Sequence, residues 1–140
     1  MAKRTTTRPH DWQGRRMLID SNLIIYALQP QYSELQEWII DNEPQYSIIS
    51  RVEVLGFARL QPLEKEAISD FLANLGVIYL NENCYQIAID LKQQRKMTLG
   101  DALIAATCLE HNKVLATRNT ADFTWIQNLE VINPLETNCP

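Results

Sequence analysis

Short apolar runs alternate along the chain with stretches in which apolar residues recur at helical spacing. We expect strands over the apolar runs, at residues 17–19, 46–49, 77–80, 113–117 and 130–132. Helices are predicted between them, over 23–28, 33–43, 50–60, the stretch after Pro62, 84–91 and 101–111, with a short helix at 120–126. The segment 101–111 is apolar nearly all round, which is typical of a helix buried in the middle of a fold.

This alternation predicts a single α/β domain. Short strands between helices favour a parallel sheet, here of about five strands, flanked by helices on both faces. Right-handed crossovers then place the carboxyl end of every strand along one edge of the sheet, where open α/β folds bind ligands. Residues 1–16 show no periodicity, and we interpret them as a flexible basic tail ahead of a domain over 17–140.

The charges are unevenly distributed. Residues 1–16 hold five Lys or Arg against Asp11 alone, whereas the rest of the chain holds eight against sixteen acids. The body is therefore acidic, which does not predict a broad electrostatic attraction to nucleic acid. If this protein handles a phosphate polymer, a cation that is not part of the sequence has to mediate the contact.

The composition also limits where the protein acts. Apolar runs of only a few residues predict no membrane span, and no apolar segment of the kind found in secretory signals follows the basic start. Cys84, Cys108 and Cys139 are odd in number and far apart, so neither a disulfide framework nor a zinc site is expected. These features favour the reducing cytoplasm.

Four acids lie where strands end or helices begin: Asp20, Glu53, Asp101 and Asp122. Each has a structural explanation. Ser50 and Glu53 match a capping box, and Asp101 and Asp122 are placed to complement helix dipoles. Asp20 is harder to explain in this way, because an acid at the end of an apolar strand is costly unless it has a partner.

Considered together, the four acids predict a cation site. Carboxylates gathered at one sheet edge repel each other unless cations lie between them. Oxygen ligands without histidine or cysteine favour Mg²⁺ or Mn²⁺ over zinc. Two such ions about 3.5–4 Å apart can activate water and stabilise the leaving oxygen in phosphodiester cleavage.

Several stretches, in this order, resemble those of PIN-domain nucleases, and most of all VapC-type toxins. They are Ile19-Asp20-Ser21-Asn22, the segments 50–55 and 99–107, and Ala116-Thr117-Arg118-Asn119-Thr120-Ala121-Asp122-Phe123. Asn133-Pro134-Leu135 is similar to the end of that family, so the resemblance covers about Met17 to Leu135.

The resemblance implies a site, a reaction and partners. By position it implies a metal-binding set of Asp20, Glu53, Asp101 and Asp122, with four supporting polar residues: Asn22, Ser50, Thr117 and Asn119. It implies an endoribonuclease that cleaves single-stranded RNA with Mg²⁺ or Mn²⁺. It also implies a cognate antitoxin protein and a homodimer.

Other interpretations remain open at this stage. Asn22 and Asn119 are explained equally well by turn chemistry. A phosphoryl-accepting aspartate at position 20 would want a second aspartate where Asn22 stands, and no glycine-rich loop for a nucleotide cofactor follows a strand. A non-catalytic RNA- or protein-binding module on the same fold is the main rival. Trp125 has the spacing of a core residue, which we favour over base stacking.

Overall fold

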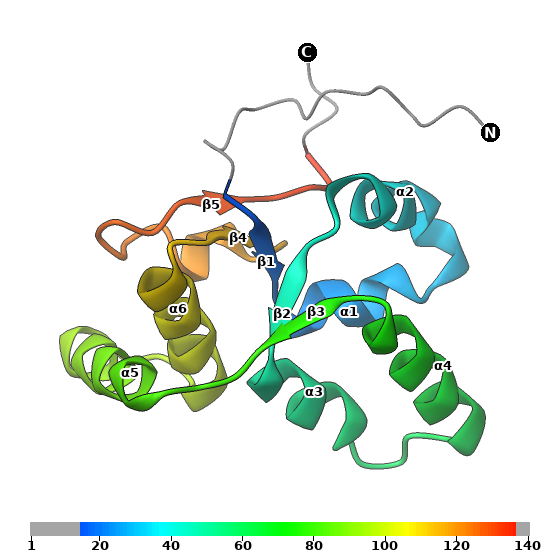
Figure 1. The fold of residues 1–140 in the computed structure, drawn as a ribbon, viewed down its shortest axis with the longest axis horizontal. Coiled ribbons are helices and arrows are strands. Elements are labelled where there is room, and N and C mark those ends of the chain that lie inside the picture. Colours follow the sequence, from blue (N-terminus) through cyan, green and yellow to red (C-terminus); the bar gives the residue numbers. More distant parts are fainter. Residues whose placement is uncertain (1–14, 137–140) are drawn as a thin grey trace.

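A computed structural model describes residues 15–136, which form a five-stranded sheet surrounded by helices (Figure 1). The strand order is β3-β2-β1-β4-β5, and every neighbouring pair is parallel. The strands are β1 (Met17–Ile19), β2 (Gln45–Ser47), β3 (Gly76–Ile78), β4 (Val114–Ala116) and β5 (Val131–Ile132). The predicted α/β fold with a parallel sheet is confirmed.

Helices cover both faces of this sheet, as expected. They are α1 (Ser21–Ala27), α2 (Ser33–Asn42), α3 (Ile48–Leu55), α4 (Pro62–Ala73), α5 (Glu82–Gln94) and α6 (Leu99–His111), with short 3-10 helices η1 (Pro30–Tyr32) and η2 (Thr120–Asp122). In Figure 1, α5 and α6 lie on one side of the strands and α1, α2 and α4 on the other. Helix α3 contacts both α1 and α6 and so closes the lower end of the sheet.

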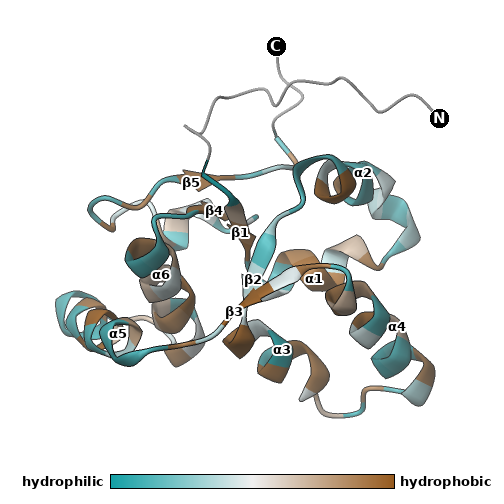
Figure 2. Cartoon of the chain, viewed as in Figure 1, coloured by the Kyte–Doolittle hydropathy of each residue, from teal (hydrophilic) through white to brown (hydrophobic). Residues whose placement is uncertain are grey.

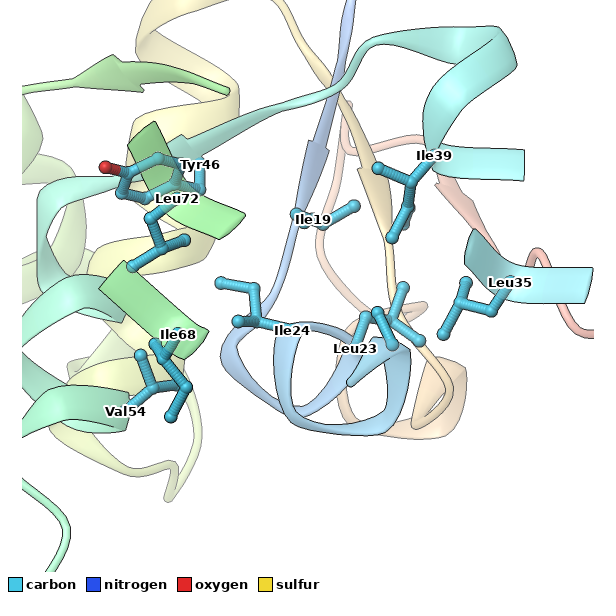
Figure 3. Packing of buried hydrophobic residues seen from close by; sticks show 11 residues of the cluster. Ile19, Leu23, Ile24, Leu35, Ile39, Tyr46, Val54, Ile68 and Leu72 are labelled. Carbon is cyan, nitrogen blue, oxygen red and sulfur yellow. The ribbon is translucent and has the colours of Figure 1, made fainter. Parts of the chain in front are cut away.

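Successive residues of the central strands point into two separate cores. Leu18 of β1 and Leu115 of β4 pack with the buried side of α5 and α6. The next residues, Ile19 and Ala116, pack with α1, α2, α3 and α4. Figure 3 shows Ile19 lying among the aliphatic side chains of the second core. A strand buried on both faces is continuously apolar, which explains why Met17 to Ile19 has no polar residue.

The outer helices carry both hydrophilic and hydrophobic residues (Figure 2). This is the pattern of helices that bury one face and leave the other in water. Helix α6 differs, because seven consecutive residues from Ala102 to Cys108 are buried between the sheet and α5, as predicted from its sequence. No helix within residues 15–136 is long and apolar enough to span a membrane.

Several predicted boundaries are wrong. The helix expected over 50–60 ends at Leu55, where the N–H of its C-cap Gly56 donates to the Val52 carbonyl. The strand expected at 46–49 ends at Ser47, because the Ser47 hydroxyl accepts the Ile49 N–H and starts α3 there. The helix expected over 120–126 is only η2, followed by turns.

Most of the predicted tail, residues 1–14, lies outside the described residues. Arg15 forms an ion pair with Glu130, and the Arg16 carbonyl accepts the Val114 N–H.

Candidate metal centre at the carboxyl edge of the sheet

Asp20 directly follows the central strand β1 and is only 4% exposed. Its extended backbone makes it the N-cap of α1, where Oδ1 accepts the Leu23 N–H at 3.0 Å. The other oxygen, Oδ2, accepts the hydroxyl of Thr117 at 2.5 Å. Thr117 follows the neighbouring strand β4 and is itself fully buried. Asp20 is therefore held rigidly at the middle of the sheet edge, with both carboxylate oxygens fixed by donors.

Glu53 reaches this edge from α3. Its Oε1 accepts the hydroxyl of Ser21 at 2.5 Å, and Ser21 also bonds the buried Ser50 hydroxyl at 2.9 Å. The capping box expected between Ser50 and Glu53 is wrong, because the N-cap of α3 is Ser47, three residues before Ser50. The carboxylate of Glu53 consequently contacts α1, the helix whose N-cap is Asp20.

Asp101 lies in the first turn of α6. Thr98 is the N-cap of this helix, and its hydroxyl accepts the Asp101 N–H at 3.1 Å. Gly100 packs directly against the end of Glu53, since a Cβ at that position would overlap Oε2 of the glutamate. The missing side chain lets the start of α6 approach α3 closely, which brings Glu53 beside the residue that precedes Asp101.

Asp122 is exposed at the end of η2. Together with Asp101 it lines a cavity of about 320 Å³ between this 3-10 helix and the start of α6. The four predicted acids thus lie along one edge, each contributed by the segment that follows a strand or opens a helix.

The charges of these acids act on one another. Burial raises the pKa of Asp20, and the negative charges of Asp101 and Glu53 raise it further, against the hydrogen bonds from Thr117 and Leu23. Burial also raises the pKa of Asp101, as do the charges of Asp122 and Glu53, while Thr98 lowers it. Neighbouring acids therefore disfavour the ionisation of Asp20 and of Asp101.

The supporting residues divide into two groups. Ser50 and Thr117 are buried and hydrogen-bonded at the site. Asn22 and Asn119 are exposed, and the observed contribution of Asn119 is its backbone N–H, which bonds Thr117 Oγ1 at 3.0 Å. Their role as orienting side chains stays a prediction.

Two residues of the site were not anticipated, Ser21 and Thr98. Thr98 had a usable signal, since Thr98 and Asp101 have the spacing of a capping box. Ser21 had none, because its partner Glu53 is distant in sequence and meets it only through packing.

Oxygen donors without nitrogen or sulfur suit a hard divalent cation, and the mutual repulsion of the acids is what such a cation would relieve. In residues 15–136, however, no three His, Cys, Asp or Glu side chains are already gathered tightly enough to hold an ion. The donor chemistry fits a metal, and the acids are neighbours rather than a closed cluster. A larger cavity of about 630 Å³ between α2 and α4 contains none of them.

The fold and this acidic edge together define an α/β protein of the PIN type. The family model of the PIN domain matches residues 17–125, and the chain belongs to this family. The resemblance inferred from the sequence motifs is thereby confirmed. No curated protein matches the chain. PIN domains of VapC toxins are in general nucleases and generally use divalent metals.

Several solved structures with the same fold belong to toxin–antitoxin systems. A toxin–antitoxin complex from Klebsiella pneumoniae is 26% identical, with a TM-score of 0.69 over 84% of this chain and 97% of that one. VapBC-1 from nontypeable Haemophilus influenzae is 24% identical, with a TM-score of 0.73 over 86% and 98% of the two chains. VapBC2 from Rickettsia felis, bound to a promoter DNA fragment, is 22% identical, with a TM-score of 0.71 over 84% and 97%.

Proposed function

We propose that this protein is a divalent-metal-dependent endoribonuclease that cleaves single-stranded RNA in the cytoplasm, as the toxin of a toxin–antitoxin pair. The observation that supports this most directly is the line of acids at the sheet edge, centred on the buried Asp20. A carboxylate that is buried next to other carboxylates costs stability, and such a cost is characteristic of functional sites.

We assign the metal-binding role to Asp20, Glu53, Asp101 and Asp122, with Mg²⁺ or Mn²⁺ as the ion. A bound ion of this kind supplies Lewis acidity at the phosphate and lowers the pKa of a water molecule that it holds. The protein's own contribution is positioning. Thr117 and the Leu23 N–H fix Asp20, Ser21 turns the Glu53 carboxylate toward α1, and Thr98 holds the start of α6.

Incubation of purified protein with end-labelled single-stranded RNA tests the reaction. We expect cleavage with Mg²⁺ or Mn²⁺ and none with a chelator. Asp20→Asn should reduce the rate at least 100-fold, because it removes a charge that binds the ion. Asp70→Asn, on the outer face of α4, removes an exposed carboxylate away from the site and should leave the rate unchanged. RNA cut at the wild-type rate by Asp20→Asn would reject the assignment.

A non-catalytic binding module is the second candidate, and one observation favours it. The acids of residues 15–136 do not form a ready-made three-residue metal group. The two functions differ in their metal requirement. A binding module binds RNA in the presence of chelator and leaves it intact. A nuclease cleaves RNA with the ion and forms no cleavage product when the ion is removed.

We assign the antitoxin to an apolar groove between α1, α3 and α4. This groove, of about 300 Å³, is lined by Ile25, Phe57 and Ile68 among others, and Phe57 is 66% exposed. The similarity of this chain to the toxin–antitoxin complex from Klebsiella pneumoniae and to VapBC-1 supports such a partner. We expect a small DNA-binding protein encoded by the neighbouring reading frame to co-purify with this chain. Phe57→Asp should abolish co-purification and leave RNA cleavage intact.

We also propose a homodimer as the state of the free protein. Light scattering of the purified chain measures its molar mass directly. A mass of one chain, about 16 kDa, at micromolar concentration would contradict the dimer.

A further inference from the structure

We propose that the cavity beside Asp101 and Asp122 is a subsite for one nucleotide of the RNA strand. In this subsite the base stacks on Trp125, and Arg95 and Lys96 bind the adjoining phosphate. The inference rests on the proposed function and deepens it, because it names the residues that recognise the substrate next to the reacting phosphate.

The position of the cavity is the first observation. Two of the site acids, Asp101 and Asp122, form part of its lining, and Arg95, Lys96 and Trp125 form another part. Its volume of about 320 Å³ lies at the small end of ligand pockets, of roughly 300–1,000 Å³. A pocket of this size suits a single nucleotide rather than a duplex. A nucleotide held there lies next to the carboxylates to which we assign the metal.

The charge of the lining is the second observation. The body of the protein is acidic, yet three cations fall within five residues: Lys92 in the last turn of α5, and Arg95 and Lys96 just after it. Lys92 donates to the Met97 carbonyl at 2.8 Å and so steadies the connecting segment. Arg95 and Lys96 are exposed. Acids and cations that face one cavity suit a ligand with an anionic phosphate. The cations bind the phosphate, and the acids hold a metal ion beside it.

Trp125 provides the third observation. The half-buried ring packs against the core cluster of α5 and α6, as its spacing predicted. Its Nε1–H donates to the Asp122 carbonyl at 2.9 Å, so the ring is fixed to the residue that carries a site acid. The Arg95 guanidinium lies over the ring, 5.2 Å from its centre. Core packing therefore accounts for one part of the indole, and the exposed cation of Arg95 covers another.

These contacts suggest an exchange on RNA binding. Every nucleobase has a π-face that can stack on an indole, and base–aromatic stacking is largely independent of sequence. A base that takes the place of the guanidinium retains a stacking partner for Trp125 and releases Arg95 to the phosphate. The alternative is that the Arg95–Trp125 contact only anchors the segment before α6, in which case RNA binding does not depend on it.

An RNA-binding measurement distinguishes stacking of a base on Trp125 from a purely structural Arg95–Trp125 contact. It follows the fluorescence anisotropy of a fluorescein-labelled eight-nucleotide RNA with protein that carries Asp20→Asn. This background keeps the cavity and is expected to suppress cleavage. We expect Trp125→Ala to raise Kd about 5- to 150-fold, the range for loss of one base–aromatic stack. Trp125→Phe, which keeps an aromatic face, should rescue most of the loss. Lys65→Ala, on the outer face of α4, is the charge-matched control and should leave Kd unchanged.

The salt dependence tests the phosphate contact independently of folding. A plot of the logarithm of the association constant against the logarithm of the salt concentration has a negative slope. Lys96→Ala and Arg95→Ala should each reduce the magnitude of this slope by about 0.7, the value for one phosphate contact on a single strand. Both residues are exposed, so these variants should leave the core intact. They test the subsite even if Trp125→Ala fails to fold. Unchanged slopes and an unchanged Kd in the Arg95→Ala, Lys96→Ala double variant would overturn the subsite.

The outcomes distinguish this inference from the proposed function. If the wild-type protein cleaves RNA and the cavity variants bind and cleave as it does, only the subsite is rejected. If the wild-type protein binds RNA through Trp125 and Lys96 but cleaves none, the nuclease function is rejected and the subsite is supported.

Discussion

The hydroxyl of Thr117 donates a hydrogen bond of 2.5 Å to Asp20, and this bond joins the ends of two neighbouring strands. Both residues are buried, so neither has water as a substitute partner. The same hydroxyl accepts the Asn119 N–H, which fixes the start of the segment that leads to Asp122. One side chain therefore positions parts of the site that come from opposite ends of the chain.

Thr117→Val should destabilise the protein by about 1–3 kcal/mol, because it leaves a buried carboxylate oxygen and a backbone N–H without this partner. It should also raise the pKa of Asp20, since the lost hydrogen bond lowers it in the native protein. Urea denaturation and the pH profile of RNA cleavage measure the two effects. Thr117→Ser keeps the hydroxyl and is the control. An acid limb of the profile that stays in place in Thr117→Val would contradict this role.

Asp20→Asn should make the metal-free protein more stable. Asparagine caps a helix as well as aspartate does and removes a buried charge that Asp101 and Glu53 disfavour. We expect a rise in Tm of a few degrees, since about 1 kcal/mol corresponds to roughly 2–4 °C in a chain of this size. Added Mg²⁺ should then raise the Tm of the wild-type protein and leave that of Asp20→Asn unchanged. Equal stabilisation of both proteins by Mg²⁺ would exclude Asp20 as a ligand.

Gly100→Ala should separate activity from stability. Alanine is about 0.5–1 kcal/mol better than glycine inside a helix, so the fold should not suffer. The new Cβ, however, would occupy the space of the Glu53 carboxylate, which can move because it ends a flexible side chain. We expect unchanged or increased thermal stability with RNA cleavage reduced by at least tenfold. Glu53→Ala, Gly100→Ala should show no further loss beyond Glu53→Ala. A further loss would mean that Gly100 acts in another way.

The contribution of Asp20 to the stability of the metal-free protein should fall as pH rises from near 3.8. The pKa of Asp20 is raised in the folded state, so the folded protein holds this proton more tightly than the unfolded chain does. The unfolded state therefore binds fewer protons between the two pKa values, and the free energy of unfolding decreases with pH in that window. Urea titrations with chelator across the window, with Asp20→Asn as reference, isolate this group. A difference between the two proteins that does not change with pH would refute the expectation.

The position of Asp20 at the end of a strand could be predicted from the sequence, because the apolar run ends at this acid. A buried acid at such a place needs hydrogen-bond donors. The sequence did not allow the donors to be identified. The hydroxyl of Thr117 comes from β4, and only the parallel pairing of β1 with β4 brings it to Asp20. Local patterns contain no information about such a pairing.

Glu53 illustrates a second limit. Two serines, Ser47 and Ser50, are both suitable caps, and the apolar Ile48 and Ile49 between them fit a strand or a helix. The sequence pattern favoured the later serine, whereas the structure uses the earlier one. The close approach of Gly100 decides where the glutamate points, and this approach depends on packing between distant helices.

The pairing of β1 with β4 also has a consequence for the nascent chain. The partner strand of Met17–Ile19 is synthesised roughly a hundred residues later, and Asp122 follows only after it. The central pair of strands therefore closes only after Val114–Ala116 have been synthesised, and such long-range pairing is slow to form. A growing chain that has not yet reached Asp122 therefore lacks one of the four acids to which we assign the metal.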